Sequence, residues 1–336
     1  MKQVVASAPG KICFAGEDID WSVTGPVILG AIDIRTQVSI RGNTEKTNII
    51  KIVAEGSVNS NYSYHLGKQN LYSNHELDYI VAALNLFQGL GVKLHEMEIE
   101  ITSNLPAQAG VGSSSAVSIA IIGALNEYYS VGLDIQDICH YAYLVESKEL
   151  NIGSGQMDMY VCGMGGVLHL NTRSIPINEI LQLSFPSNIR ILLVDFKKPS
   201  ATAEAVARNK RRYDEKDPDM IDYITNTLKL VDDIKLILMK NDANIDMLAQ
   251  CISNSHDNMR FKLKATNTVI DDCVDLLKQD GVIAVKKTGG GSDGCIFALI
   301  YEFQVPSLIQ KLSTYPVKSF ITKITSTGLE VKSVKA

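Results

Sequence analysis

The fold is decided by one stretch, Pro106-Ala107-Gln108-Ala109-Gly110-Val111-Gly112-Ser113-Ser114-Ser115-Ala116. Its two glycines and three consecutive serines stand directly before an apolar run, 117–125, which predicts a buried helix introduced by the glycine–serine turn. Unpaired N–H groups and the positive end of the helix dipole gather at such an N-terminus, and glycines let a ligand approach the backbone. The stretch predicts an anion site, most often one for phosphate; glycines that only permit tight packing are the alternative.

Composition places the chain among ordinary globular proteins. Its 336 residues suffice for one large domain or two of ordinary size, and 46% are hydrophobic and 21% charged. The formal net charge of −5 argues against nucleic acid as the main partner, and no apolar run is long enough to span a bilayer. The first residues lack the apolar segment of a signal peptide, and the six cysteines form no Cys-x-x-Cys pair. We expect a cytoplasmic monomer or homodimer with free thiols and without nucleic-acid or membrane partners.

Runs of apolar and β-branched residues alternate with helical patterns along the chain. Strands are expected at 3–8, 11–15, 27–40, 49–53, 97–101, 190–195, 282–285 and 294–300, with a turn at Ala8-Pro9-Gly10 and a hairpin over 161–170. Helices are expected at 77–87, 135–150 and over most of 201–264. Strands, then helices, then strands again predict an α+β fold of two sheets, each with helices on one face. We place a domain boundary after residue 180, giving domains 1–180 and 181–336.

A lysine and three acids lie close together near the start of the chain. Lys11 follows Ala8-Pro9-Gly10, and the acids Glu17, Asp18 and Asp20 come within the next ten residues. These carboxylates could accept hydrogen bonds from the hydroxyl groups of a substrate. The alternative is a solvated acidic loop and a surface lysine.

Two further segments are of interest: one around residues 146–158, which carries two acids, and a glycine-rich turn at 287–294. Asp158 follows the turn Gly153-Ser154-Gly155, and Glu146 lies in the helical stretch before it. A carboxylate delivered by a tight turn is a candidate general base, whereas a helix cap or turn acid is the alternative. A second turn, Lys287-Thr288-Gly289-Gly290-Gly291-Ser292-Asp293-Gly294, holds more glycines than a simple hairpin needs. It predicts close approach to a ligand or to another loop, with a wide flexible turn as the alternative.

Together these segments, in this order and spacing, resemble the motifs of the GHMP kinase family. The first motif is similar to 8–20, the second to 106–116 and the third to 287–294, so the resemblance covers nearly the whole chain. In the third, Ser292 and Asp293 stand where the family usually continues with Gly or Phe-Gly. The resemblance implies the two-domain GHMP kinase fold: an N-terminal domain like ribosomal protein S5 and a ferredoxin-like C-terminal domain, both contributing to the active site.

Within the family, the motifs look like two different branches. Gly16-Glu17-Asp18-Ile19-Asp20-Trp21 is similar to the galactokinase pattern Gly-Glu-His-Thr-Asp-Tyr, with Asp18 in place of the histidine, and 155–158 looks like the galactokinase Gly-Ile-Met-Asp. Lys11 and the stretch 31–36 look like mevalonate kinases instead. Because Asp20 suits a polyol acceptor, we expect a galactokinase-like sugar kinase. A mevalonate kinase of the isoprenoid pathway and a non-catalytic sugar and ATP sensor are the alternatives.

The resemblance also implies ATP and Mg²⁺ as cofactors and transfer of the γ-phosphoryl group to a hydroxyl group of a sugar. Asp158 would act as general base beside Lys11, and Ser114 and Glu146 would hold Mg²⁺. The ATP phosphates would be bound by Gly110, Val111, Gly112, Ser113, Ser114 and Ser115. The sugar would contact Glu17, Asp18, Asp20, Gly155 and Asp158.

Overall fold

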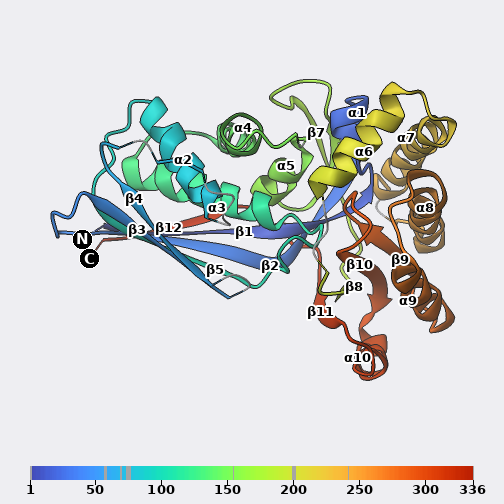
Figure 1. Ribbon diagram of the computed structural model, residues 1–336. Coiled ribbons are helices and arrows are strands. Elements are labelled where there is room, and N and C mark those ends of the chain that lie inside the picture. Colours follow the sequence, from blue (N-terminus) through green and yellow to red (C-terminus); the bar gives the residue numbers. More distant parts are fainter. Residues whose placement is uncertain are drawn as a thin grey trace.

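Two β-sheets with helices packed against them make up the structure (Figure 1). The computed structural model describes residues 2–56, 59–68, 70–72, 77–153, 155–198, 202–240 and 242–335. The mixed α+β fold expected from the sequence is confirmed, because helices follow strands in both halves of the chain and each sheet carries its own helices.

Within the described residues, the first sheet has eight strands. In order across it lie β12 (Glu330–Lys335), β1 (Lys2–Ala15), β2 (Pro26–Gly42), β5 (Met97–Ser103), β3 (Ile49–Gly56) and β4 (Ser60–His65). From β2 the sheet also extends through β6 (Val167–Asn171) to β7 (Glu179–Leu183). The strands β3 and β5 run parallel, whereas the other pairs are antiparallel. The first and last of these strands along the chain, β1 and β12, are therefore neighbours.

One face of this sheet is covered by helices (Figure 1). They are α2 (Asp78–Gly89), α3 (Ser113–Tyr129), α4 (Ile135–Leu144), which continues as a π-helical turn (Val145–Glu149), and α5 (Met157–Met164). The helix α3 lies between the sheet and the other helices, contacting β1, β2, α2, α4 and α5. Its residues are therefore apolar on nearly every side. A short helix, α1 (Ile19–Ser22), precedes β2.

The second sheet is antiparallel and has the order β11 (Lys318–Thr322), β8 (Ile189–Asp195), β10 (Cys295–Tyr301) and β9 (Ala284–Thr288). Between β8 and β9 the chain forms α6 (Thr202–Asp214), α7 (Pro218–Leu238), α8 (Ile245–Asn258), a π-helical turn (Met259–Leu263) and α9 (Thr268–Gln279). A 3-10 turn (Glu302–Gln304) and α10 (Val305–Leu312) connect β10 to β11. The helix α8 contacts both β9 and β1, so it lies where the two sheets meet. Among the helices of the described ranges, none has the length and apolar character needed to cross a bilayer.

Two local predictions are wrong. The expected hairpin over 161–170 is instead the end of α5 followed by β6, and Gly165 and Gly166, both at φ 75°, turn the chain between them. The strand β1 runs through residues 8–10, where a turn was expected, with a register shift between Pro9 and Gly10. The domain boundary after residue 180 stays a prediction; β12, from the far side of that boundary, belongs to the first sheet.

Candidate active site

The glycine–serine stretch introduces α3, as the sequence predicts. Gly112 is the N-cap with a φ of 72°, and Gly110 has a φ of 77°, a region that glycine adopts without steric cost. No side chain of the described residues caps this helix, so the N–H groups of its first turn are open to a ligand. The Lys11 N–H donates to the Val111 carbonyl at 2.9 Å, which ties the loop to β1. The geometry suits a phosphate group; that ATP phosphates bind here stays a prediction.

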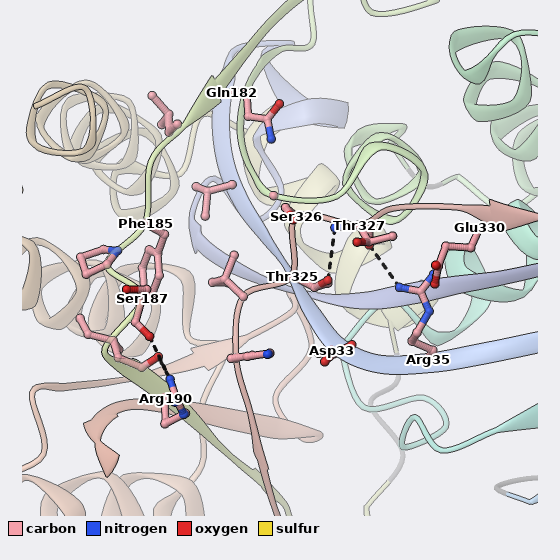
Figure 2. Close-up of a pocket in the computed structure, with 17 residues that line it drawn as sticks. Asp33, Arg35, Gln182, Phe185, Ser187, Arg190, Thr325, Ser326, Thr327 and Glu330 are labelled. Atoms are coloured by element: carbon pink, nitrogen blue, oxygen red, sulfur yellow. Dashed lines mark hydrogen bonds and ion pairs between the residues drawn. The ribbon is translucent and has the colours of Figure 1, made fainter. Parts of the chain in front are cut away.

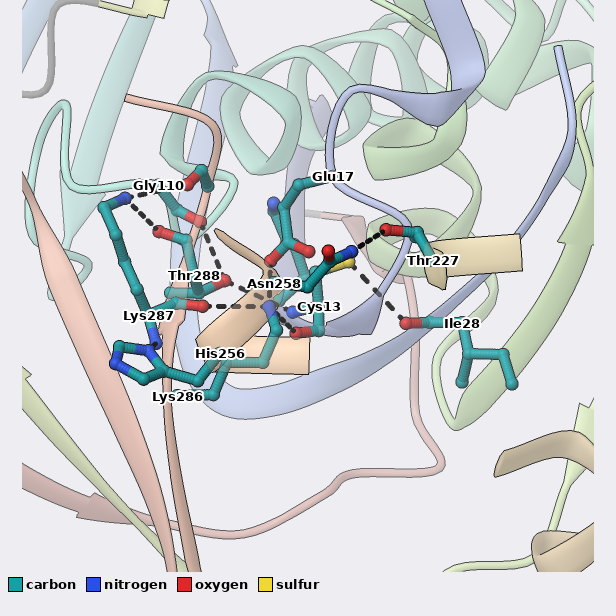
Figure 3. A network of polar contacts seen from close by, with 12 residues as sticks. Cys13, Glu17, Ile28, Gly110, Thr227, His256, Asn258, Lys286, Lys287 and Thr288 are labelled. Carbon is teal, nitrogen blue, oxygen red and sulfur yellow. Dashed lines mark hydrogen bonds and ion pairs between the residues drawn. The ribbon is translucent and has the colours of Figure 1, made fainter. Parts of the chain in front are cut away.

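The third motif, residues 287–294, packs against the glycine–serine loop that precedes α3. A Cβ atom on Gly289 would lie 2.8 Å from Gly110 Cα, so the two backbones touch. Thr288 Oγ1 donates to the Gly110 carbonyl at 3.3 Å, and the Cys295 N–H donates to the Ala109 carbonyl at 3.0 Å. Figure 3 shows Thr288 beside Gly110. The expected approach of this motif to another loop is therefore confirmed.

Lys11 on β1 and Asp158 on α5 form an ion pair. Lys11 Nζ lies 3.1 Å from Asp158 Oδ2, and the side chains are 3% and 27% exposed. Burial alone would lower the pKa of Lys11, but the Asp158 carboxylate, with smaller contributions from Cys13 and Glu17, raises it above its ordinary value. The ammonium group is therefore charged at neutral pH. Asp158 is open enough for an acceptor hydroxyl group to reach it.

Asp20 lies next to this ion pair. Its Oδ2 accepts the N–H of Met157, the residue before Asp158, at 3.3 Å. Burial, followed by repulsion from Asp158, raises the pKa of Asp20 to about 7. Gly155 makes room for this carboxylate, because a Cβ atom on Gly155 would collide with it. Two carboxylates and a lysine thus share one corner of the fold, a set of groups that can accept and hold a proton.

Ser114 and Glu146 both lie near Tyr79. The Tyr79 hydroxyl interacts with Ser114, and burial, followed by the charge of Glu146, raises the pKa of Tyr79 above its ordinary value. Magnesium bound to a nucleotide needs only one or two protein oxygens, since phosphates and water complete its shell. No cluster of three or more His, Cys, Asp or Glu side chains suited to a metal occurs among the described residues. Ser114 and Glu146 fit nucleotide-bound Mg²⁺, and this role stays a prediction.

Glu17 and Asp18 have partners on other elements. Glu17 pairs with the buried Lys286 of β9. Asp18, held at a φ of 62°, accepts hydrogen bonds from Trp21 Nε1 and from Asn209 Nδ2 of α6, both at 2.8 Å. These contacts favour a structural role for both acids over the predicted contact with a sugar.

Comparison with known proteins identifies the family. Residues 78–166 match the family described as GHMP kinases N terminal domain, and residues 237–318 match GHMP kinases C terminal. Mevalonate kinases of Thermococcus sibiricus and Pyrococcus abyssi are 29% and 30% identical over 99% of this chain and 99% and 98% of their own lengths. This chain belongs to the GHMP kinase family.

A galactokinase is also similar in sequence to this GHMP kinase, and solved structures of both a mevalonate kinase and a galactokinase match its fold. A galactokinase of Thermosipho africanus is 24% identical over 91% of each chain. The structure of the Methanococcus jannaschii mevalonate kinase matches with a TM-score of 0.81 at 22% identity, covering 96% of this chain and 98% of that one. The Lactococcus lactis galactokinase, complexed with galactose, matches with a TM-score of 0.82 at 17% identity, covering 98% and 95%. These structures show a shared fold and do not separate the two branches.

Lys286, Asn209 and Asn267 of this GHMP kinase were not among the predicted site residues. Asn267 caps α9, and its Nδ2 donates to Asp293 Oδ1 at 3.0 Å, so the acid of the third motif is held at the start of α9. A signal for Lys286 exists in the sequence, since two adjacent lysines directly follow the apolar run 282–285. Asn209 carries no such signal, because it lies in a helix rich in polar residues.

A cavity with a volume of about 640 Å³ is lined by other residues, among them Arg35, Phe185 and Glu330, as Figure 2 shows. The ion pair of Arg35 with Glu330, at 3.4 Å, stands in its wall. Arg35 also donates to the carbonyls of Thr327 and Gly328, at 3.2 and 2.6 Å, so its charge is already engaged. The cavity shares no lining residue with the candidate active site. It therefore does not indicate where a substrate would lie in that site.

Asp20→Asn is expected to change how stability depends on pH. The folded pKa of about 7 lies above the ordinary value of 3.8, so Asp20 favours the folded protein at low pH, and this contribution is lost as the pH rises toward 7. Each pKa unit corresponds to about 1.4 kcal/mol. As the pH rises from the ordinary pKa of 3.8 to about 7, the free energy of unfolding of the wild type, relative to that of the variant, should fall by a few kcal/mol. Urea unfolding at several pH values measures it, and parallel pH curves would contradict the raised pKa.

Proposed function

We propose that this GHMP kinase transfers the γ-phosphoryl group of Mg-ATP to a hydroxyl group of mevalonate. The observation that carries the proposal is full-length similarity: the mevalonate kinases are 29% and 30% identical, whereas the galactokinase is 24% identical over a smaller share of the chain. The sugar acceptor expected from the sequence has weaker support than its alternative, mevalonate. A cytoplasmic location and the oligomeric state stay predictions.

The site weakens the argument for a sugar, which depended on Asp20 as a ligand for a polyol. Asp20 is 8% exposed and already accepts the Met157 N–H. Asp18, beside it in the sequence, is bound by other side chains. Arg208 on α6 lies within electrostatic range of Asp18. A carboxylate such as that of mevalonate can form an ion pair with an arginine, whereas a neutral sugar can only accept hydrogen bonds from it.

In the proposed reaction Asp158 and Lys11 act on the acceptor hydroxyl group. Asp158 accepts a hydrogen bond from the hydroxyl group and takes its proton during transfer, while the charged Lys11 stabilises the oxygen that loses it. The N–H groups at the start of α3 bind phosphate oxygens. Ser114 and Glu146 would hold Mg²⁺, which would supply positive charge to offset that of the phosphates. Phosphoryl transfer needs such positioning and charge stabilisation more than covalent chemistry.

An ADP-release assay with separate acceptors tests the proposal. Mevalonate, galactose and homoserine are each supplied with Mg-ATP, and we expect release with mevalonate at least about a hundredfold above the other two, because a site with polar groups rejects acceptors that leave them unpaired. The variant Asp158→Asn must lose the activity, which excludes a contaminating kinase. Release with galactose alone would establish a sugar kinase instead. Stabilisation by a sugar without release from any acceptor would establish a sensor.

A further inference from the structure

The start of α5, the helix that carries Asp158, is not capped by its own N-cap residue. Gln156 is the N-cap, but its side chain donates to the carbonyl of Ser174 at 2.6 Å and accepts no N–H group of the first turn. Asp158 is the second residue of this helix, so its position depends on how the first turn is held. The N–H groups at a helix start need an oxygen acceptor from outside the helix.

Asp20 supplies such an acceptor from a distant part of the chain. Its Oδ2 accepts the N–H of Met157, the first residue of α5, at 3.3 Å. The same carboxylate occupies the space beside Gly155, where the three atoms nearest to an added Cβ all belong to Asp20. Asp20 is buried, so water competes little for this hydrogen bond. The position also suits an acid because the start of a helix carries partial positive charge.

The segment that carries Asp20 is itself fixed by the second half of the chain. The Glu17 carbonyl accepts the hydroxyl group of Tyr223, on α7, at 2.7 Å. The Asp18 carboxylate accepts Asn209 Nδ2, from α6, at 2.8 Å. Two helices therefore hold the residues directly before α1, and they hold Asp20 against the start of α5.

We propose that Asp20 is a positioning residue for the general base: by capping α5, it sets where the Asp158 carboxylate lies relative to Lys11. Asp20 acts through the helix and does not touch the acceptor, so this role differs from the sugar contact expected from the sequence. A displacement of about 1 Å at a reacting group can lower the rate by about a hundredfold. The inference rests on the proposed kinase function.

The charges around Asp20 decide the pH at which this role is tested. Burial, followed by repulsion from Asp158 and a smaller repulsion from Asp18, raises the pKa of Asp20 to about 7, and Lys11 opposes this shift. At about pH 6 the Asp20 side chain is therefore mostly neutral. A neutral carboxyl group still has an oxygen that accepts an N–H group. Kinetics at this pH measure the contribution of the acceptor and not that of the charge.

Steady-state kinetics of Asp20→Ala, with Mg-ATP and mevalonate at about pH 6, test the role. The variant removes the acceptor, so kcat should fall by at least about tenfold. The KM values for ATP and mevalonate should stay within about twofold, because a positioning residue binds neither substrate. Asp20→Asn keeps an oxygen acceptor for the Met157 N–H and should be at least about fivefold faster than Asp20→Ala.

Gly155→Ala disturbs the same contact from the other side, and it keeps the test open if Asp20→Ala does not fold. The added methyl group displaces the Asp20 carboxylate, so kcat should again fall by at least about tenfold. In the double variant Asp20→Ala, Gly155→Ala this carboxylate is absent. The two losses should therefore not multiply, because both act through one contact.

The matched control is Asp134→Ala, which removes the acid that caps another helix, α4. Asp134 Oδ1 accepts the Asp137 N–H at 2.8 Å. This variant should unfold at a lower urea concentration than the wild type and keep its kcat, because the cap of α4 does not hold Asp158.

The possible results separate the role of Asp20 from the kinase function. If Asp20→Ala keeps kcat within about twofold of the wild type, or if the losses multiply in the double variant, the role of Asp20 is refuted while the kinase function stands. A raised KM for mevalonate at unchanged kcat would refute it as well and make Asp20 a substrate ligand. If the wild type releases no ADP with any acceptor, the kinase function and this inference both fail.

Discussion

Asp158→Asn is expected to lower kcat with mevalonate by about a thousandfold, while the Kd for ATP changes by less than about threefold. An amide cannot take the proton of the acceptor hydroxyl group, and it deprives Lys11, 3.1 Å from Asp158 Oδ2, of its carboxylate. Because asparagine has nearly the shape of aspartate, the loop around Gly110 and the start of α3 should keep their arrangement. Steady-state kinetics give kcat, and a nucleotide titration gives Kd.

The control for this variant is Asp275→Asn, which changes an acid of α9 with a 53% exposed side chain and should leave both constants unchanged. An Asp158 variant that retained more than about a tenth of the wild-type kcat would end the general-base assignment. A loss of ATP affinity as large as the loss of kcat would place Asp158 among the nucleotide ligands instead.

Lys286→Met is expected to lower the free energy of unfolding by about 3–5 kcal/mol. The substitution leaves Glu17, whose side chain is 2% exposed, as a buried charge without its cation. It also removes the hydrogen bonds that Lys286 Nζ donates to the carbonyls of Cys13, at 3.1 Å, and Lys287, at 2.9 Å. Urea unfolding, followed by fluorescence or circular dichroism, measures the change.

The double variant Glu17→Gln, Lys286→Met separates charge from packing. It removes both members of the pair, so we expect it to be more stable than the sum of the two single variants by about 2 kcal/mol or more. Strict additivity of the single variants would show that Lys286 contributes through the packing of its side chain. In that case the buried ion pair would not be the source of the stability.

The parts of the fold and site that the sequence could predict depend on residues close together in the chain. The apolar run behind Gly112 predicts α3 because a buried helix and its glycine turn are local patterns. The hairpin prediction over 161–170 failed for a related reason. Five consecutive residues of α5, 159–163, are buried, and a buried run of this kind shows no helical period that would distinguish it from a strand.

The partners of the acids near the start of the chain could not be predicted in this way. Glu17 meets Lys286 across a separation of 269 residues, and only the packing of the second sheet against β1 brings them together. Asp18 adopts a left-handed backbone conformation that the neighbouring residues in the sequence do not predict. Its hydrogen-bond partner Asn209 comes from α6, far along the chain. Acids that resemble substrate ligands in the sequence are thus engaged by side chains from the other half of the chain.

The pairing of β12 with β1 has a consequence for the order in which this protein folds. Lys2 lies opposite Lys335, and Ser7 lies opposite Glu330. Among the described strands β1 is therefore synthesised first, and its partner β12 is synthesised last. During translation, β1 therefore presents an open edge of N–H and C=O groups, which invites pairing with other chains. Contacts of such large sequence separation also slow folding. The sheet that carries Lys11 is completed only after the second sheet has been made, and residues 1–180 do not form it alone.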